Sequence, residues 1–307
     1  MKKVFIDGSS GTTGLKVANR LAARKDIEII TIPDEHRKNN DAIKERINAS
    51  DITFLCLPDD AAKEAVTLVE NENTVIIDTS TAHRVNPDWT YGFAEIKGQR
   101  EKIAQAKKIA NPGCHASGFI SLAAPLVSAG IIPEDAQLSC FSLTGYSGGG
   151  KSMIADYESP SRDPLLDSPR MYGLTKKHKH LPEMAKISGL KYDPIFCPIV
   201  APYYAGMEVV IPVFPEMFGT SKEKIEEVFE EYYKTKMVHF KKAADENGFM
   251  AANAFEGKDT MEISVEGNEE RVLLISRFDN LGKGASGAAI QNMNIALGLE
   301  ESTGLVL

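Results

Sequence analysis

The sequence predicts an α/β protein of two domains, a doubly wound parallel sheet followed by a mixed, largely antiparallel sheet. Short apolar runs alternate with helical patterns up to residue 110, which is typical of a parallel sheet covered on both faces. A glycine-rich turn follows the first run, and after residue 114 the alternation gives way to longer strands and irregular loops. A chain of 307 residues with 43% hydrophobic content can bury the cores of two such domains.

Composition excludes several classes of protein. A net charge of −8 and a pI near 5.4 argue against nucleic acid as the main partner, because that role normally requires a basic face. No apolar run approaches the length of a membrane span, and the first one is too short for a signal peptide. Four scattered cysteines without disulfide spacing predict a cytoplasmic protein.

The first strand, residues 3–7, leads into the turn Gly8-Ser9-Ser10-Gly11-Thr12-Thr13-Gly14 and then a helix over 15–24. Glycines in this context let backbone N–H groups and a helix N-terminus approach a pyrophosphate. The alternative is a merely tight connection. We expect a dinucleotide site that includes Gly8, Ser10, Gly11, Thr12, Thr13 and Gly14.

A second strand, 27–32, precedes the loop expected to contact the ribose. Asp34 lies about 20 residues beyond the glycine motif, the position that favours NAD through the 2′-hydroxyl. Arg37 follows in a basic cluster that could instead hold the 2′-phosphate of NADP. The residues alone leave both cofactors open.

The alternation continues with helices over 41–49, 59–69 and 96–106 and strands over 52–57, 74–78 and 108–110. Parallel strands end at one edge of their sheet, where ligands of such folds bind. Arg84 follows the strand at 74–78, so it is either a surface cation or a group that binds a substrate phosphate or carboxylate.

Asn111-Pro112-Gly113-Cys114-His115 puts a thiol after a tight turn and at the start of an apolar helix, 116–129. A helix N-terminus favours thiolate over thiol, whereas Cys56, Cys140 and Cys197 lie in strand-like runs and look like ordinary core. Lowering a thiol pKa from about 8.5 to about 6.5 needs about 2.7 kcal/mol, and a helix terminus supplies about 0.3 to 1. A nucleophilic Cys114 therefore needs a second helper, most naturally a histidine.

The second domain begins with a strand over 137–144 that ends in a glycine-rich turn, Gly145 to Lys151. This turn is either a flexible loop or an anion cradle built from Ser147, Gly148 and Lys151. A long loop, residues 158–172, then leads to Lys176-Lys177-His178-Lys179-His180-Leu181-Pro182-Glu183. No third zinc ligand with recognisable spacing is nearby, so we expect no metal site, and the lysines would help keep a histidine neutral.

Strands in 195–213, 260–266 and 271–279 and a helix over 221–234 complete the second sheet. Its open apolar face predicts packing against a second copy, in a dimer or tetramer. The glycine-rich turn over 279–287 feeds a final helix over 288–299.

Four motifs together resemble the N-acetyl-γ-glutamyl-phosphate reductases of arginine biosynthesis, in particular their shorter type. They are GSSGTTG from Gly8, DTSTAHR from Asp78, YGFAE from Tyr91 and NPGC from Asn111. The resemblance covers nearly the whole chain and implies membership of the aspartate-semialdehyde dehydrogenase superfamily. The histidine and arginine that longer-type relatives carry in 195–213 are missing here, which fits the shorter type.

The resemblance also implies specific roles. NADPH becomes the reductant, with Arg37, Asn280, Lys283 and Gly284 added to the cofactor site. The HxHxPE pattern implies that His180, or else His178, is the acid–base group, with Tyr172 lining the site and Glu183 orienting a histidine. The dinucleotide domain becomes 1–114 plus 285–307, and the catalytic and oligomerisation domain 115–284.

The predicted reaction is reduction of an acyl phosphate through a thioester on Cys114, giving N-acetylglutamate semialdehyde. Arg84, Ser147, Gly148, Lys151 and Tyr172 are the predicted substrate groups. Two alternatives remain open. One is the same chemistry on aspartyl phosphate or an N-blocked aminoadipyl phosphate, and the other is a non-catalytic dinucleotide sensor.

Overall fold

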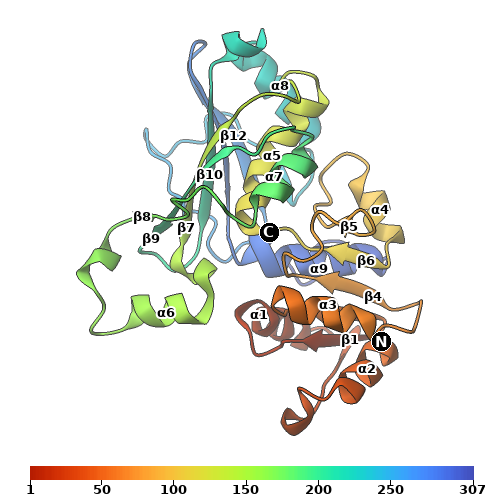
Figure 1. The fold of residues 1–307 in the computed structure, drawn as a ribbon. Helices are drawn as coiled ribbons and strands as arrows, with labels where there is room; N and C mark the ends of the chain where they lie inside the picture. Colours follow the sequence, from red (N-terminus) through yellow and green to blue (C-terminus); the bar gives the residue numbers. More distant parts are fainter. The chain divides into compact units, whose positions relative to one another are not determined.

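The computed structural model describes residues 1–307, except for the side chain of Asp34, so the prediction that involves this carboxylate lies outside the described residues. The chain divides into two compact units (Figure 1). Unit 1 comprises residues 1–112 and 285–305, and unit 2 comprises 113–284 and 306–307. The sequence-based division was placed after residue 114 and before residue 285.

Unit 1 is built on a six-stranded, all-parallel sheet in the order β2-β1-β3-β4-β6-β5. The chain leaves β1 on one side for β2 and returns on the other side for β3, which makes the ends of β1 and β3 the switch point where such sheets bind ligands. The strands are β1 (Lys2–Asp7), β2 (Ile27–Ile30), β3 (Ile52–Leu55), β4 (Val75–Asp78), β5 (Thr90–Tyr91) and β6 (Lys108–Ala110).

Helices cover both faces of this sheet, because the strand side chains that point to either face are apolar. Val4 and Ile6 face a core shared with α1, α4 and α9, whereas Phe5 faces a core shared with α2 and α3. The helices are α1 (Thr12–Ala22), α2 (Asn40–Ala49), α3 (Asp59–Thr67), α4 (Gln99–Gln105) and α9 (Gly287–Ala296), with a 3₁₀ turn η1 (Asp34–His36). The predicted doubly wound parallel fold is confirmed.

Two predicted helix starts in unit 1 were wrong, and one strand was missed. Helix α1 begins at Thr12 and not at residue 15, so the last part of the glycine turn forms the first helical turn. Helix α4 begins at Gln99 and not at residue 96, because Gly98, with a φ of 75°, precedes it as the N-cap. The two-residue strand β5 was missed, since Thr90 and Tyr91 are too few for a periodic pattern.

Unit 2 is built on a seven-stranded mixed sheet in the order β11-β12-β13-β10-β7-β9-β8. Four of its six pairings are antiparallel, and β11–β12 and β7–β9 are parallel. The strands are β7 (Ser139–Gly145), β8 (Arg170–Met171), β9 (Ile195–Ala201), β10 (Met207–Val213), β11 (Val238–Phe240), β12 (Met261–Gly267) and β13 (Val272–Phe278). The predicted mixed, largely antiparallel sheet is confirmed.

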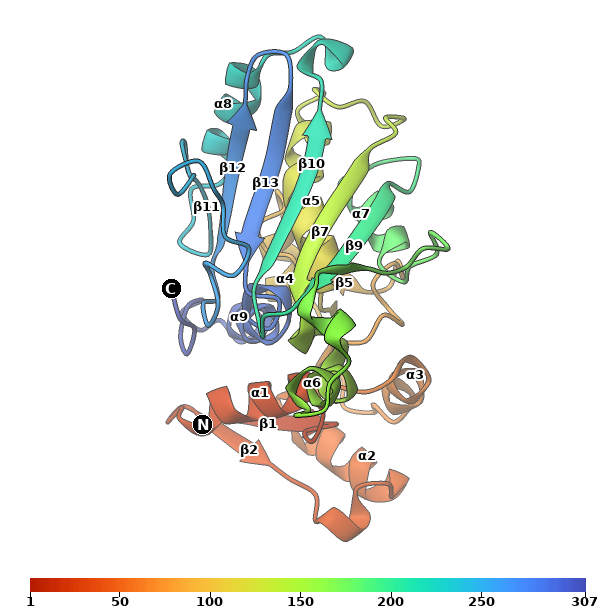
Figure 2. The same cartoon turned by 90° about the vertical axis from the view of Figure 1, so that its left-hand side faces the viewer.

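Helices α5 (Cys114–Ser128), α7 (Leu181–Ser188) and α8 (Lys222–Tyr232) lie behind this sheet in the view of Figure 2. Helix α5 is buried on nearly all sides, which explains its uninterrupted apolar sequence. Helix α8 begins as predicted, with the Ser221 hydroxyl accepting from the Lys224 N–H at 3.2 Å. The other sheet face carries half-exposed apolar side chains, among them Phe141 and Leu273.

Several elements of unit 2 were not predicted. Residues 145–151 were expected to form a turn, but the chain forms a 3₁₀ turn η2 (Tyr146–Gly149) and then α6 (Gly150–Glu158). The loop expected over 158–172 contains the 3₁₀ turn η3 (Pro164–Asp167) and the short strand β8. Four further elements were also missed: α7, β11, the 3₁₀ turn η4 (Pro215–Phe218) and the π-helical segment η5 (Gly282–Ser286).

Unit 1 contains a stacked pair of aromatic rings, His83 and Trp89. Trp89 is 8% exposed, and its ring stacks on His83 with 4.1 Å between centroids. Trp89 is also part of the apolar core that contains Phe5 and Ile76. Within the described residues, no helix is both long and apolar enough to span a membrane.

Candidate functional site

Helix α5 begins at Cys114, with Gly113 as its N-cap, so the predicted place of this thiol is confirmed. The N-cap glycine has no side chain to cap the helix and the first turn of α5 holds no acid, so the helix dipole makes this end positive. Cys114 is partly accessible, whereas the next residues of α5 are buried. The geometry therefore presents one thiol at a positive helix end.

Glu183 connects the start of α5 with the histidine segment. One carboxylate oxygen accepts from the Gly113 N–H at 3.2 Å, and the other lies 3.9 Å from Nε2 of His180. Glu183 is 1% exposed and His180 is 5% exposed. A buried carboxylate beside an imidazole orients the ring and stabilises its protonated form.

His115 is held at both ring nitrogens. Nδ1 lies 2.6 Å from Ser142 Oγ on β7, and Nε2 lies 2.8 Å from the hydroxyl oxygen of Tyr172. Burial, with a smaller contribution from His178, lowers the pKa of His115 to about 3. His115 is therefore neutral at physiological pH and carries one ring proton.

The rings of His115, His178 and His180 form a cluster. The His115 ring lies 5.9 Å from that of His178 and 5.7 Å from that of His180, and the last two are 4.8 Å apart. The backbone N–H of His180 donates to Nδ1 of His178 at 3.2 Å, so a neutral His178 carries its ring proton on Nε2. In the described part of the chain, no group of His, Cys, Asp or Glu side chains is arranged to hold a metal ion.

The turn after β13 packs directly on Cys114. A Cβ atom added to Gly284 would lie 3.0 Å from Cys114 Cβ, 3.1 Å from the Asp279 carbonyl oxygen and 3.2 Å from Phe278. Gly284 is part of η5, a π-helical segment, and such segments are frequent at functional sites. Lys283 beside it is 1% exposed.

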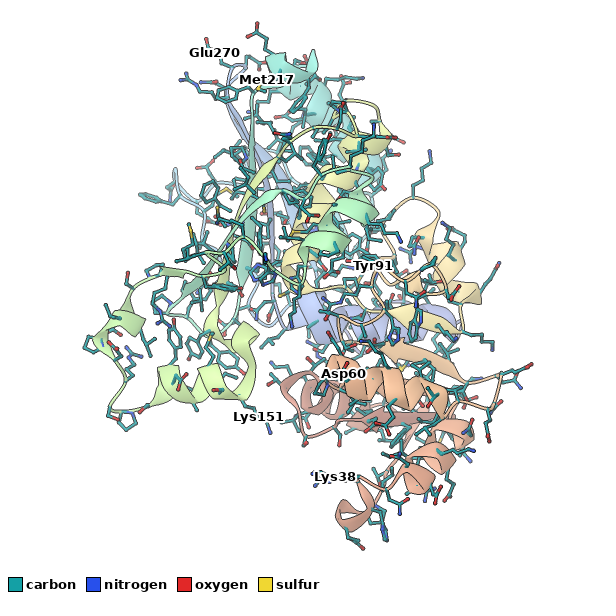
Figure 3. All side chains as sticks on the ribbon, viewed as in Figure 1. Lys38, Asp60, Tyr91, Lys151, Met217 and Glu270 are labelled. Carbon is teal, nitrogen blue, oxygen red and sulfur yellow. The ribbon has the colours of Figure 1, made fainter. Side chains whose placement is uncertain are left out.

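Asn280 joins the turns of unit 2. Its Oδ1 accepts from the Gly206 N–H at 2.9 Å, and its Nδ2 donates to Ser147 Oγ at 3.1 Å. The predicted ligand groups Asn280 and Ser147 thus bond to each other and hold three turns together. Gly148 packs on Thr144 and Asn280, and Lys151 is exposed on the first turn of α6 (Figure 3).

The glycine turn of unit 1 is shaped by close contacts. Gly8 has a φ of +81°, and a Cβ there would lie 2.3 Å from the Cys56 carbonyl oxygen. A Cβ on Gly14 would lie 2.3 Å from the Gly8 carbonyl oxygen. Gly11 differs, because its Cβ would have no contact closer than 3.4 Å. Two glycines are thus required by the fold, whereas a Cβ on the third, beside the uncapped N-terminus of α1, would make only ordinary van der Waals contacts.

Arg84 is largely buried. Its Nε donates to the Asn111 carbonyl oxygen at 3.0 Å and its Nη2 to the Thr79 carbonyl oxygen at 3.1 Å. His83 beside it is bound through Nδ1 to Asp78 at 2.6 Å. These bonds hold the chain at the ends of β4 and β6. Arg37 is exposed after η1.

Sequence reasoning missed two residues of this arrangement, His115 and Ser142. The available signal for His115 was that it directly follows Cys114 in a chain with six histidines. Ser142 gave no signal, because a serine within an apolar strand is common and the contact spans 27 residues.

Comparisons with known proteins agree on the family. Residues 3–106 match the family model described as the semialdehyde dehydrogenase NAD binding domain, and residues 114–280 match the semialdehyde dehydrogenase dimerisation domain. The chain is 48% identical to N-acetyl-gamma-glutamyl-phosphate reductase of Brucella ovis, over 96% of this chain and 99% of that protein. The reductase of Brucella abortus gives the same identity and coverage.

Solved structures share the fold at low identity. An aspartate semialdehyde dehydrogenase II from Vibrio cholerae matches with a TM-score of 0.72 at 14% identity, covering 97% of this chain and 98% of that one. A Candida albicans aspartate semialdehyde dehydrogenase with NADP matches with a TM-score of 0.68 at 15% identity, covering 97% and 99%.

Proposed function

Because the chain belongs to the N-acetyl-γ-glutamyl-phosphate reductases, within the semialdehyde dehydrogenase family, we propose that it reduces N-acetyl-γ-glutamyl phosphate to N-acetylglutamate semialdehyde and phosphate. This is a reaction of arginine biosynthesis. The observation that carries the proposal is Cys114 at the N-terminus of α5, with a histidine cluster and Glu183 on neighbouring elements. This arrangement suits a cysteine nucleophile that works with an acid–base partner.

In the first half of the reaction the Cys114 thiolate attacks the γ-acyl carbon. A carbon–sulfur bond forms, the carbon–oxygen bond to phosphate breaks, and phosphate leaves with the bonding electrons. The positive end of α5 stabilises the thiolate before attack. The result is an acyl thioester on Cys114.

In the second half, a bound NADPH would supply the hydride needed to reduce this thioester carbon. His180 then transfers the proton to and from the oxygen of the resulting thiohemiacetal. Collapse of the thiohemiacetal releases the aldehyde and restores the Cys114 thiolate. His180 is our choice over His178 because it lies beside the Glu183 carboxylate, which stabilises a protonated imidazole. The imidazole therefore gains and loses its proton next to a fixed negative charge.

The glycine turn after β1 fits the pyrophosphate of a dinucleotide. Packing within the protein does not require a glycine at position 11, because a Cβ there would have no contact closer than 3.4 Å. The N-terminus of α1 has neither a side-chain cap nor an acid in its first turn. Ser10, Thr12 and Thr13 would hold the phosphates with the three glycines. We assign NADPH as the reductant, with the exposed Arg37 as the group that would bind the 2′-phosphate.

The turn over 279–286 would meet the nicotinamide end through Asn280, Lys283 and Gly284. The close packing of Gly284 on Cys114 supports this role, because it brings that turn to the nucleophile. For the substrate, we assign anion recognition to Arg84, Ser147, Gly148 and Lys151, with Tyr172 lining the site through its contact with His115. The Ser147 backbone N–H donates to the Tyr204 carbonyl oxygen at 3.0 Å, and its hydroxyl accepts from Asn280, so the hydroxyl proton is the Ser147 donor that we expect to face the anion.

We also propose that two or more copies assemble through the open face of the unit 2 sheet. Half-exposed Phe141, Ile195 and Leu273 support this, as does the match to a dimerisation domain model. Light scattering at micromolar concentration should detect a dimer or tetramer, and a monomer would refute the proposal. All four cysteines are free, which supports a cytoplasmic location.

The decisive assay is the reverse reaction. N-acetylglutamate semialdehyde should sustain the reduction of NADP⁺ only when inorganic phosphate is present, because phosphate must attack the thioester carbon and displace the Cys114 thiolate. Comparing kcat/KM with aspartate semialdehyde and N-acetylaminoadipate semialdehyde tests the acyl group. Preference for either of these would overturn the substrate, and failure with all three would favour a dinucleotide sensor.

A further inference from the structure

Asn280 holds the hydroxyl group of Ser147 in one direction. The Oδ1 atom of Asn280 accepts from the Gly206 N–H at 2.9 Å, and its Nδ2 atom lies 3.1 Å from Ser147 Oγ. A backbone N–H can only donate, so the amide atom that faces Gly206 must be the oxygen and the one that faces Ser147 the nitrogen. The amide nitrogen is a donor only, so Ser147 Oγ accepts this bond. The Ser147 hydroxyl proton must therefore point elsewhere.

That hydroxyl proton has no acceptor within the described residues. Ser147 is 1% exposed, and Asn280 is the sole hydrogen-bond partner of its hydroxyl group there. A buried O–H group without an acceptor is costly, and native proteins contain few of them. Such a donor suits an acceptor that arrives with a ligand, and an oxyanion oxygen forms the strongest hydrogen bond of this kind.

The backbone of residues 145–147 cannot supply this donor instead. The N–H groups of Gly145, Tyr146 and Ser147 donate to the carbonyl oxygens of Gly206, Tyr203 and Tyr204, at 2.9, 2.9 and 3.0 Å. These bonds tie the segment to the turn between β9 and β10. A Cβ on Gly145 would lie 2.5 Å from the Tyr204 carbonyl oxygen, so the two segments are in close contact. An anion that reaches residues 145–147 would therefore meet the Ser147 hydroxyl and not a cradle of backbone N–H groups.

Asn280 is itself held in a closed turn. The Asp279 carbonyl oxygen accepts from the Gly284 N–H at 2.9 Å, which closes the turn that carries Asn280. A Cβ added to Gly284 would lie 3.0 Å from Cys114 Cβ, so this turn packs on the proposed nucleophile. Asn280 therefore fixes Ser147 from a turn that contacts Cys114.

We propose that Asn280 is a positioning residue that sets the Ser147 hydroxyl as a hydrogen-bond donor to an oxyanion of the substrate. The side chain of Asn280 then acts through Ser147, so any contact of Asn280 with the nicotinamide is left to its backbone. The inference deepens the proposed function, because it rests on a substrate that carries anionic groups. The proposed substrate has two of them, the acyl phosphate and the α-carboxylate, and both present oxyanion oxygens.

Binding of the two anionic groups can be measured without turnover. Inorganic phosphate and N-acetylglutamine, which carries the α-carboxylate but no phosphate, are titrated by calorimetry into the full chain saturated with NADP⁺. Ser147→Ala should weaken the binding of at least one probe about tenfold to thirtyfold, because a hydrogen bond to an anion is lost. The affinity for NADP⁺ should change less than twofold. The probe whose binding weakens identifies the anionic group that Ser147 contacts.

Asn280→Ala tests the positioning role. It should weaken the binding of the same probe about threefold to tenfold, because the Ser147 hydroxyl is then free to rotate away from the anion. The double variant should lose no more affinity than Ser147→Ala alone, because Asn280 acts through the hydroxyl that this variant lacks. A merely structural role of Asn280 would instead give additive losses.

Thr144→Val is the matched control for the loss of a buried hydroxyl. Thr144 is 4% exposed, lies three residues before Ser147, and donates to the Gly145 carbonyl oxygen at 3.2 Å. This variant should leave the affinities for both probes within twofold of wild type. Melting followed by circular dichroism identifies any variant that does not fold, and Ser147→Ala, which removes a single oxygen atom, then carries the test.

Several outcomes would overturn the inference. They are a wild type that binds neither probe, unchanged affinities in folded Ser147→Ala or Asn280→Ala, and additive losses in the double variant. A loss of NADP⁺ affinity in Asn280→Ala that exceeds its loss of probe affinity would also overturn it, because the side chain would then contact the cofactor. If the affinities change as expected but N-acetylglutamate semialdehyde gives no reverse reaction, the proposed function fails and the inference stands. If wild type is active and no affinity changes, only the inference fails.

Discussion

Helices α1 and α5 begin in the same way and differ in what surrounds their first turns. Each follows a glycine N-cap, and neither has a side-chain cap or an acid in its first turn. In α1 the first turn is half-exposed and the helix is amphipathic, with burial at Gly14, Val17 and Leu21. In α5 nearly every residue after Cys114 is buried. The positive N-terminus of α1 is therefore suited to bind an anionic ligand, whereas that of α5 is suited to stabilise a thiolate of the protein itself.

The comparison predicts that the two helix ends can be disabled separately. Cys114→Ser should lower kcat by about 10⁴-fold or more, because an alcohol at a helix end stays protonated at neutral pH. NADPH affinity, which we assign to α1, should change less than twofold. Steady-state assays and fluorescence titration of NADPH provide the two readouts, and residual activity above 1% of wild type would contradict a role for Cys114 as the nucleophile.

Gly284→Ala tests how tightly the α5 end is packed. The new methyl group would lie 3.0 Å from Cys114 Cβ, so the thiol or the turn must shift by a few tenths of an ångström. We expect kcat to fall about tenfold to fiftyfold with a smaller change in NADPH affinity, since misplacing a nucleophile is costly. Gly130→Ala is a control for a glycine change in unit 2, because no atom lies within 4 Å of its Cβ position, although its positive φ will lower stability somewhat. Equal kcat values for Gly284→Ala and wild type would show that the packing does not position Cys114.

Gly11→Ala tests the α1 end. Its Cβ would have no protein contact closer than 3.4 Å, so the melting temperature should stay within about 2 °C of wild type. The affinity for NADPH should fall about fivefold to tenfold, because the methyl group fills space that we assign to phosphate. Gly8→Ala is the matched comparison: with a Cβ 2.3 Å from a carbonyl oxygen and a φ of +81°, it should lower stability by about 2 kcal/mol or more. Unchanged NADPH affinity in a folded Gly11→Ala would remove α1 from the cofactor site.

The smallest effect concerns acid stability in unit 2. The folded-state pKa of His115 is about 3, below the ordinary value of 6.5, so the unfolded chain binds this proton first as the pH falls. The contribution to stability is complete above pH 6.5 and is lost at about 1.4 kcal/mol per pH unit as the pH falls toward 3. Urea unfolding at pH 7, 6 and 5 should show a shallower pH dependence for His115→Phe than for wild type. Parallel curves would contradict the burial of a neutral imidazole.

The elements that sequence predicted well are those with a periodic pattern of their own. The strands and helices of unit 1 follow from apolar alternation, and Cys114 at the start of α5 follows from a Pro-Gly turn before a long apolar run. Helix α6 was missed because its first residue, Gly150, ends a run of three glycines, and glycine is the weakest helix former after proline. That helix is held by tertiary contact, with Tyr157 stacked on Tyr146 at 4.6 Å.

The candidate site was predictable in its types of residue and not in its connections. Cys114, His178, His180 and Glu183 have recognisable motifs. The bond between Ser142 and His115, and that between Asn280 and Ser147, join residues 27 and 133 positions apart, and one chain contains no pattern that pairs them. Such contacts arise only when the sheet of unit 2 forms.

Trp89 is an intrinsic fluorescent probe that reports on unit 1. It is the one tryptophan of the chain, it is buried in unit 1, and it stacks on His83. Its emission therefore monitors the melting of unit 1, while far-ultraviolet circular dichroism reports both units. A difference between the two melting curves would measure how independently the units unfold, and a change of emission on titrating NADPH would be a signal that arises in unit 1.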